Sequence, residues 1–195
     1  MTRREAIQRI VTGLTDEPVV ASLGHPAYDL YAASDRPENF YTWGSMGVAS
    51  SIGLGLAMAC AKRRVVVLDG DGSLLMNLGS LATIAWRRPP NLVVIVLDNQ
   101  AYGTTGGQAT ATSVCADLEA TARALGIFAA ATVRSLEELE STLAESRRVE
   151  GPWVIVAKVE ESAPSAKPPL DCVFIKQRFM AALGPGEAAT RGAPA

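Results

Sequence analysis

The sequence has few cysteines, a single histidine and no long run of apolar residues. Its 195 residues include three cysteines, Cys60, Cys115 and Cys172, which lie far apart and outside any CxxC spacing. An odd number of scattered cysteines supports neither a disulfide framework nor a zinc site, so we expect reduced thiols. No apolar run reaches membrane-spanning length, and the N-terminus lacks the apolar core of a signal peptide. We therefore expect a cytoplasmic protein that is not associated with a membrane.

The sequence also lacks a large excess of positive or negative charge. The chain has 18 Lys and Arg against 20 Asp and Glu, which gives a formal net charge of -2. Proteins that bind nucleic acid neutralise its phosphates with clustered Lys and Arg, and no basic stripe occurs in this sequence. We therefore expect no nucleic-acid partner.

The sequence does contain helical patterns that alternate with short runs rich in Val and Ile. This alternation is typical of an α/β fold with a doubly wound, mainly parallel sheet and helices on both faces. We expect one domain over residues 1–183 and a disordered tail over 184–195, where Gly, Pro, Ala and polar residues predominate. The predicted helices are 2–13, 46–61, 74–88, 114–125, 135–148 and 172–183, and the predicted strands are 18–23, 65–68, 92–97, 128–133 and 153–159.

Two polar motifs follow two of the predicted strands. Gly70-Asp71-Gly72-Ser73 follows the run 65–68, and Asp98-Asn99 follows the run 92–97. By itself, Gly-Asp-Gly is more often a tight turn, and Ser73 could be an ordinary helix cap. However, ligands bind at the carboxyl ends of parallel strands, and Asp and Asn oxygens suit a magnesium ion that carries a phosphate group. The two motifs together therefore predict a metal and diphosphate site.

The predicted helix 46–61 is unusually rich in Gly and Ala. Glycine costs about 1 kcal/mol relative to alanine within a helix, so close packing against a neighbouring backbone or a cofactor is the expected compensation. Gly53 and Gly55 suggest a dinucleotide fingerprint, but its third glycine is replaced by Met58. We therefore reject nicotinamide binding.

Together these motifs resemble thiamine-diphosphate enzymes, whose cofactor signature begins with GDG and ends with a pair of Asn residues. The resemblance covers about residues 1–183 and extends to the decarboxylases of sulfopyruvate and phosphonopyruvate. It implies a subunit of a decarboxylase that depends on thiamine diphosphate and Mg²⁺ and converts a 2-oxo acid to an aldehyde and carbon dioxide. The further matching segments are Trp43-Gly44-Ser45-Met46-Gly47, Asn77-Leu78-Gly79-Ser80-Leu81 and Tyr102-Gly103-Thr104-Thr105-Gly106-Gly107-Gln108.

The resemblance also implies roles for individual residues. Asp71 and Asn99 would bind the metal through their side chains, and Ala101 through its main-chain carbonyl. Met46 would hold the cofactor in a bent shape. His25 would contact the cofactor, act in catalysis or simply cap its loop, and no catalytic residue is certain. The implied cofactor-binding residues are Gly44, Ser45, Met46, Gly70, Gly72, Ser73, Tyr102, Gly103 and His25.

The sequence departs from the family pattern at Asp98, where the first of the paired Asn residues is expected. A carboxylate there would add negative charge near the diphosphate or bind the backbone instead. The groups that recognise the acidic end of the substrate are also not evident, and they would be Thr104, Thr105 and Gln108 or would come from a partner.

The resemblance implies that one essential part lies on another chain. In the family, a Glu that contacts the pyrimidine ring comes from a separate domain, and 195 residues are too few for both domains. We therefore expect a hetero-oligomer with a pyrimidine-binding partner subunit of similar size, and no activity for this chain alone. Two alternatives stay open, namely a subunit of a carboligase or 2-oxo acid oxidoreductase, and a regulatory subunit that binds the cofactor without catalysis.

Overall fold

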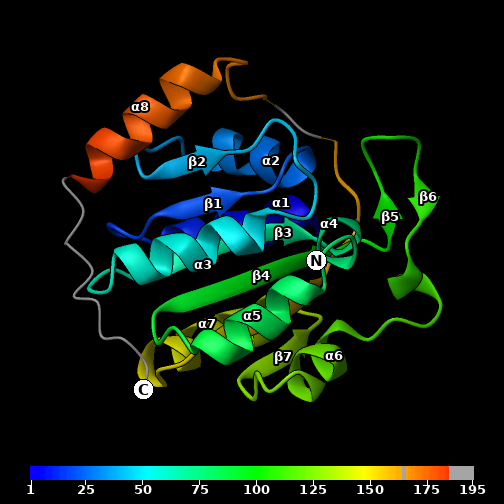
Figure 1. The fold of residues 1–195 in the computed structure, drawn as a ribbon. Helices are drawn as coiled ribbons and strands as arrows, with labels where there is room; N and C mark the ends of the chain where they lie inside the picture. Colours follow the sequence, from blue (N-terminus) through cyan, green and yellow to red (C-terminus); the bar gives the residue numbers. More distant parts are fainter. Residues whose placement is uncertain (164–165, 185–195) are drawn as a thin grey trace.

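Six parallel strands form one sheet in the computed structural model, which describes residues 1–163 and 166–184 (Figure 1). The main-sheet strands are β1 (Val19–Ala21), β2 (Asn39–Tyr41), β3 (Val65–Gly70), β4 (Leu92–Asp98), β7 (Ala130–Val133) and β8 (Trp153–Lys158). Their order is β2-β1-β3-β4-β8-β7, and every neighbouring pair is parallel. Because β2 lies outside β1 and β4 lies outside β3, the winding reverses between β1 and β3. The predicted fold class is confirmed.

Helices cover both faces of this sheet. Helices α1, α2 and α7 pack on one face, and Figure 1 shows α3 and α5 on the other, where α4 and α6 also pack. Helix α8 lies along the β2 edge, where Phe179 packs on Phe40 with ring centroids 5.3 Å apart. The bounds are α1 (Arg3–Thr12), α2 (His25–Ala33), α3 (Ala49–Ala59), α4 (Asp71–Leu75), α5 (Gly79–Arg87), α6 (Leu118–Ala124), α7 (Leu136–Arg148) and α8 (Cys172–Leu183).

Strand β4 explains why the sheet is buried on both sides. Its residues alternate between the two apolar layers, with Val93 and Ile95 in one and Val94 and Val96 in the other. A strand buried on both faces has an unbroken apolar sequence, which is the pattern found at 92–97. None of the helices in the described residues is long and apolar enough to cross a membrane. Apart from Gly184, the tail predicted over 184–195 lies outside the described residues.

The structure corrects the predicted elements in three places. Helix α2 and the short strand β2 were not expected. The helix expected over 74–88 is two helices, α4 and α5, because the chain turns at Asn77, whose amide donates to the Gly47 carbonyl at 2.9 Å. The loop expected after Asn99 contains a short antiparallel hairpin, β5 (Ala101–Tyr102) with β6 (Gln108–Ala109).

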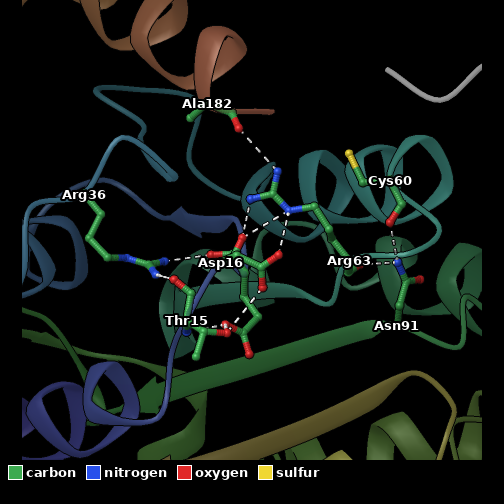
Figure 2. Close-up of polar contacts among 8 residues, drawn as sticks. Thr15, Asp16, Arg36, Cys60, Arg63, Asn91 and Ala182 are labelled. Atoms are coloured by element: carbon green, nitrogen blue, oxygen red, sulfur yellow. Dashed lines mark hydrogen bonds and ion pairs between the residues drawn. The ribbon is translucent and has the colours of Figure 1, made fainter. Parts of the chain in front are cut away.

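Hydrogen bonds and an ion pair from polar side chains connect the loops at the amino ends of the strands (Figure 2). Arg63 contacts Asp16 in the loop before β1 and donates to the Ala182 carbonyl of α8 at 3.4 Å. The Asn91 amide donates to the carbonyls of Cys60 and Arg63 at 3.0 and 2.7 Å. These contacts cross-link the amino edge of the sheet.

Helix α3 lies very close to β3, as its small residues predict. A Cβ built on Gly53 would lie 2.2 Å from Val67 Cγ2, whereas a Cβ on Gly55 would meet nothing within 4 Å. We expect Gly53→Ala to lower the free energy of unfolding by about 1–3 kcal/mol, because the added methyl group overpacks the helix–sheet contact. The matched control Gly55→Ala should raise it by up to about 1 kcal/mol, because alanine is the better helix former. Urea denaturation measures both, and effects of the same sign would contradict this packing.

Candidate functional site

A cavity of about 90 Å³ opens at the carboxyl ends of β1, β3 and β4. This edge is where the winding of the sheet reverses, the usual ligand site of a doubly wound fold. The chain therefore places Gly70-Asp71-Gly72-Ser73 and Asn99 at one concave site. The lining residues are Arg3, Ser22, Leu23, His25, Pro26, Met46, Gly70, Asp71, Gly72, Ser73, Leu97, Asn99, Ala101, Tyr102, Gly103, Thr104 and Thr105.

Asp71 is the one acidic residue among the described residues of this lining, and it is buried, with 1% of its surface exposed. It begins α4, and its Oδ2 accepts hydrogen bonds from Thr110 Oγ1 and, at 2.9 Å, from Thr112 Oγ1. Burial raises the pKa of its carboxyl, the charge of Asp98 raises it further, and the two hydroxyl donors oppose this. The carboxyl is thus fixed in orientation and poorly solvated, which favours a bound cation.

Asn99 lies at the end of the neighbouring strand. Its Nδ2 donates to Glu161 Oε2 at 2.5 Å, and its Oδ1 accepts from the Ala101 amide at 3.4 Å. Ala101 itself lines the cavity. Among the described residues, no three His, Cys, Asp or Glu side chains gather to hold a metal. The oxygen donors offered here are instead one carboxylate, one amide and one carbonyl.

Ser73 connects three segments around the cavity. Its Oγ accepts from the Gly47 amide at 3.0 Å and lies 3.1 Å from Ser22 Oγ. The loop before α3 is thereby held against the start of α4. Gly72 lies next to Tyr102, because a Cβ at Gly72 would come within 2.3 Å of Tyr102 Cε1. The close approach requires glycine and leaves the main chain of Gly72 at the cavity.

His25 is the first residue of α2 and lines the cavity beside Gly103. Its Nδ1 lies 2.8 Å from Glu161 Oε1. Burial lowers the pKa of the imidazole, and Arg3 lowers it further, while Glu161 opposes both. The balance favours a neutral ring at pH 7.

The residues before α3 divide into two groups. Met46 lines the cavity, whereas Gly44 and Ser45 are exposed and do not contribute to the lining. Ser45 has a φ of 59°, in the left-handed region, which turns the chain toward α3. The structure therefore brings only one of these three predicted residues to the cavity.

Asp98 does not line the cavity, and its side chain is fully buried. It accepts hydrogen bonds from Lys158 Nζ and from the Gln100 amide at 3.1 Å. Thr112 Oγ1 lies 2.8 Å from Asp98 Oδ1 and has a single hydrogen to share between Asp98 and Asp71. Of the two alternatives considered for this carboxylate, backbone binding occurs. The Lys158 ammonium also compensates its negative charge.

Comparison with known proteins identifies the family. Residues 25–157 match the family model described as "Thiamine pyrophosphate enzyme, C-terminal TPP binding domain". The chain belongs to this family. It is 44% identical over 186 residues to the sulfopyruvate decarboxylase subunit beta of Methanocaldococcus jannaschii, covering 93% of this chain and 96% of that subunit. It is 40% identical to the phosphonopyruvate decarboxylase of Streptomyces hygroscopicus, covering 91% of this chain but 45% of that protein.

Solved structures agree on the fold. Benzoylformate decarboxylase from Polynucleobacter necessarius matches with a TM-score of 0.66 and 20% identity, over 84% of this chain and 34% of that one. The predicted resemblance to thiamine-diphosphate (thiamine pyrophosphate) enzymes is confirmed by the family match.

The donor set fits the magnesium and diphosphate groups of a thiamine-diphosphate enzyme. Mg²⁺ prefers oxygen ligands and keeps positions for phosphate oxygens, and Asp71, Asn99 and Ala101 offer three oxygens from two adjacent strand ends. Gly72 and Ser73 lie at the same cavity at the beginning of α4. These are the residues that would hold the metal and the diphosphate.

Sequence reasoning missed several polar residues of this site. Thr110 and Thr112 carry a weak signal, because they are closely spaced hydroxyls just after the glycine-rich segment. Glu161 also carries one, because it follows β8 and so lies at the carboxyl edge of the sheet. Arg3 carries none, because its sequence neighbours indicate only a helix. Its role depends on contacts with Asp29 and Glu161 that are distant in the sequence.

Proposed function

We propose that this chain is the metal- and diphosphate-binding subunit of a thiamine-diphosphate-dependent decarboxylase, with sulfopyruvate as its 2-oxo acid substrate. The observation that carries the proposal is the meeting of Asp71, Asn99 and Ala101 at one cavity at the reversal point of the sheet. Three relatives that this chain matches over 94–98% of their own length are all named sulfopyruvate decarboxylase subunit beta, and this similarity supports sulfopyruvate as the substrate.

In this proposal, the residues of this chain bind and orient rather than react. Asp71, fixed by the threonine hydroxyls, and Asn99 hold the metal with the Ala101 carbonyl. Gly72 and Ser73 face the diphosphate at the beginning of α4. When bound, thiamine diphosphate supplies the electron sink for breaking the carbon–carbon bond that releases carbon dioxide.

The acidic end of the substrate needs polar partners within the cavity. Thr104 and Thr105 line it, whereas Gln108 is exposed on β6 and bonds to Thr105 through its side chain. His25 is the ionisable group on the same side, next to Gly103. The two threonines are therefore the proposed substrate contacts from this chain, and the remaining contacts would come from the partner.

A partner subunit is part of the proposal. Two relatives that are matched over 96% and 94% of their own length are named as beta subunits, and the described residues that line the cavity include no glutamate. We infer a hetero-oligomer in which a chain of similar size supplies the glutamate for the pyrimidine ring. The cytoplasmic location expected from the sequence belongs to the same proposal.

Reconstitution tests the proposed function. The chain and a candidate pyrimidine-binding chain of similar size from the same organism are purified separately and mixed with Mg²⁺, thiamine diphosphate and sulfopyruvate. We expect carbon dioxide and the aldehyde to form in the mixture, little or no product from either chain alone, and loss of the activity on chelation of the metal. Turnover by this chain alone, or none by the mixture, would contradict the proposal.

The same assay separates the alternatives. Faster turnover of phosphonopyruvate than of sulfopyruvate would show that phosphonopyruvate is the preferred substrate. A carbon–carbon coupled product after addition of a second carbonyl compound, in place of the aldehyde, would favour a carboligase. If the partner alone is active and this chain only changes the rate of that activity, the result would favour a regulatory subunit.

A further inference from the structure

Glu161 connects three side chains at the edge of the cavity, although no sequence motif points to it. Its Oε1 lies 2.9 Å from Arg3 Nη1 and 2.8 Å from His25 Nδ1, and its Oε2 accepts from Asn99 Nδ2 at 2.5 Å. One carboxylate thus contacts a proposed metal ligand, the only histidine of the chain and a buried arginine.

The N-terminal segment fixes the position of this carboxylate. Thr2 and Glu160 form a parallel bridge, and the Arg3 amide donates to the Glu160 carbonyl at 3.1 Å. Arg3 is 2% exposed and is anchored through Nε to Asp29 at 2.8 Å. Because Arg3 is fixed by its main chain at Glu160 and by its side chain at Asp29, the Glu161 carboxylate paired with it has a defined position next to the cavity.

The contact with Asn99 decides which end of the amide faces a metal. An Asn side chain has one oxygen and one NH₂ group, and only the NH₂ can donate to a carboxylate. With Nδ2 on Glu161, Oδ1 is the end that remains for a cation. The flipped amide would place Oδ1 against a carboxylate oxygen and its hydrogens toward the cation, and both arrangements are repulsive.

The contact with His25 decides the tautomer of the neutral ring. A carboxylate near Nδ1 keeps the proton on Nδ1, which leaves Nε2 as the unprotonated, accepting nitrogen. The same carboxylate therefore orients two different groups at the cavity, one through its Oε2 and the other through its Oε1.

We propose that Glu161 is a positioning residue that holds the Asn99 oxygen toward the metal and keeps His25 in the Nδ1–H form. The part that concerns Asn99 rests on the proposed function, because it needs a metal at this site. The part that concerns His25 does not, because it describes the chain without its cofactor.

Two measurements test this inference on Glu161→Ala, with Glu160→Ala as the matched control. Glu160 is the neighbouring acidic residue, is exposed, and takes part in the bridge only through its main chain. The first measurement is the affinity of the reconstituted pair for Mn²⁺ in the presence of thiamine diphosphate. The EPR signal of free Mn²⁺ reports how much of the ion remains unbound. We expect Glu161→Ala to weaken binding by about 10-fold or more, as loss of an outer-shell partner does, and the control to bind as the wild type does.

The second measurement is a long-range ¹H–¹⁵N NMR spectrum of this chain alone, above the imidazole pKa. Because His25 is the only histidine, its two ring nitrogens are assigned without ambiguity. We expect the Nδ1–H tautomer in the wild type and the control, and a shift toward the Nε2–H tautomer in Glu161→Ala. If Glu161→Ala does not fold, Glu161→Met, which keeps most of the size but has no oxygen acceptor for either His25 or Asn99, should change both measurements in the same direction.

The outcomes separate this inference from the proposed function. If the wild-type pair binds Mn²⁺ and the Glu161→Ala pair binds it with the same affinity, the Asn99 part is overturned and the proposed function stays intact. An unchanged His25 tautomer in Glu161→Ala would overturn the His25 part. Absence of Mn²⁺ binding in the wild-type pair would overturn the proposed function together with the Asn99 part.

Discussion

Asp71→Asn should lose Mg²⁺-dependent binding of thiamine diphosphate, with affinity falling by at least about 100-fold, more than outer-shell substitutions cost. The variant keeps the size of the side chain but removes the only charged oxygen donor proposed for the metal. Binding to the reconstituted pair, measured by isothermal titration calorimetry with and without Mg²⁺, reports this loss. The wild type should bind the cofactor only when Mg²⁺ is present.

Two features separate this effect from a folding defect. Asp71 is buried near Asp98, and both burial and that charge disfavour its ionised form in the absence of a cation. Replacement by a neutral amide should therefore leave the free energy of unfolding unchanged or raised. Asp16→Asn is the control, because Asp16 lies in the loop before β1 at the opposite edge of the sheet and its side chain is 73% exposed. Cofactor binding by Asp71→Asn at wild-type affinity would contradict the metal assignment.

Lys158→Met should lower the free energy of unfolding by about 3 kcal/mol, the lower end of the range for breaking a buried ion pair. The Asp98 side chain is fully buried, and Lys158 Nζ is its cationic partner. Without the ammonium, an uncompensated carboxylate stays in the interior, held only by neutral donors. The lower end of the range applies because the Lys158 side chain is 23% exposed and water can reach part of the pair.

A double-variant cycle makes this prediction specific. Asp98→Asn combined with Lys158→Met removes both charges and should recover most of the lost stability, since the buried charge is gone. Lys176→Met, on the exposed side of α8, is the control and should change the free energy of unfolding very little. Urea denaturation of all four proteins gives the coupling free energy. Additive effects of the two substitutions would show that Asp98 and Lys158 do not act as a pair.

The main sheet could be predicted because its central strands have local signals. The run 92–97 is apolar throughout, and the Pro89-Pro90 pair before it ends the preceding helix. Helix α2 and strand β2 were missed because they are short, and because Pro26 near the start of α2 was interpreted only as the end of a strand. The break at Asn77 was missed because it depends on a hydrogen bond to Gly47, 30 residues away.

The same distinction applies to the site. Asp71 and Asn99 were predictable because each follows a strand, and parallel strands bring their carboxyl ends to one edge. Their supporting contacts were not predictable, because Glu161 and Arg3 are 158 residues apart and meet only in the folded chain. The role of Asp98 could not be decided from its position either. It depends on Lys158, which lies on the neighbouring strand in register with it.

A crystal structure of the reconstituted pair with Mg²⁺ and thiamine diphosphate tests the central claim most directly. The account predicts a single metal ion within about 2.1 Å of an Asp71 carboxylate oxygen, Asn99 Oδ1 and the Ala101 carbonyl, with diphosphate oxygens in its remaining positions. A metal ion and diphosphate bound elsewhere, or the oxygens of residues 71 and 99 too far apart to share one ion, would contradict it.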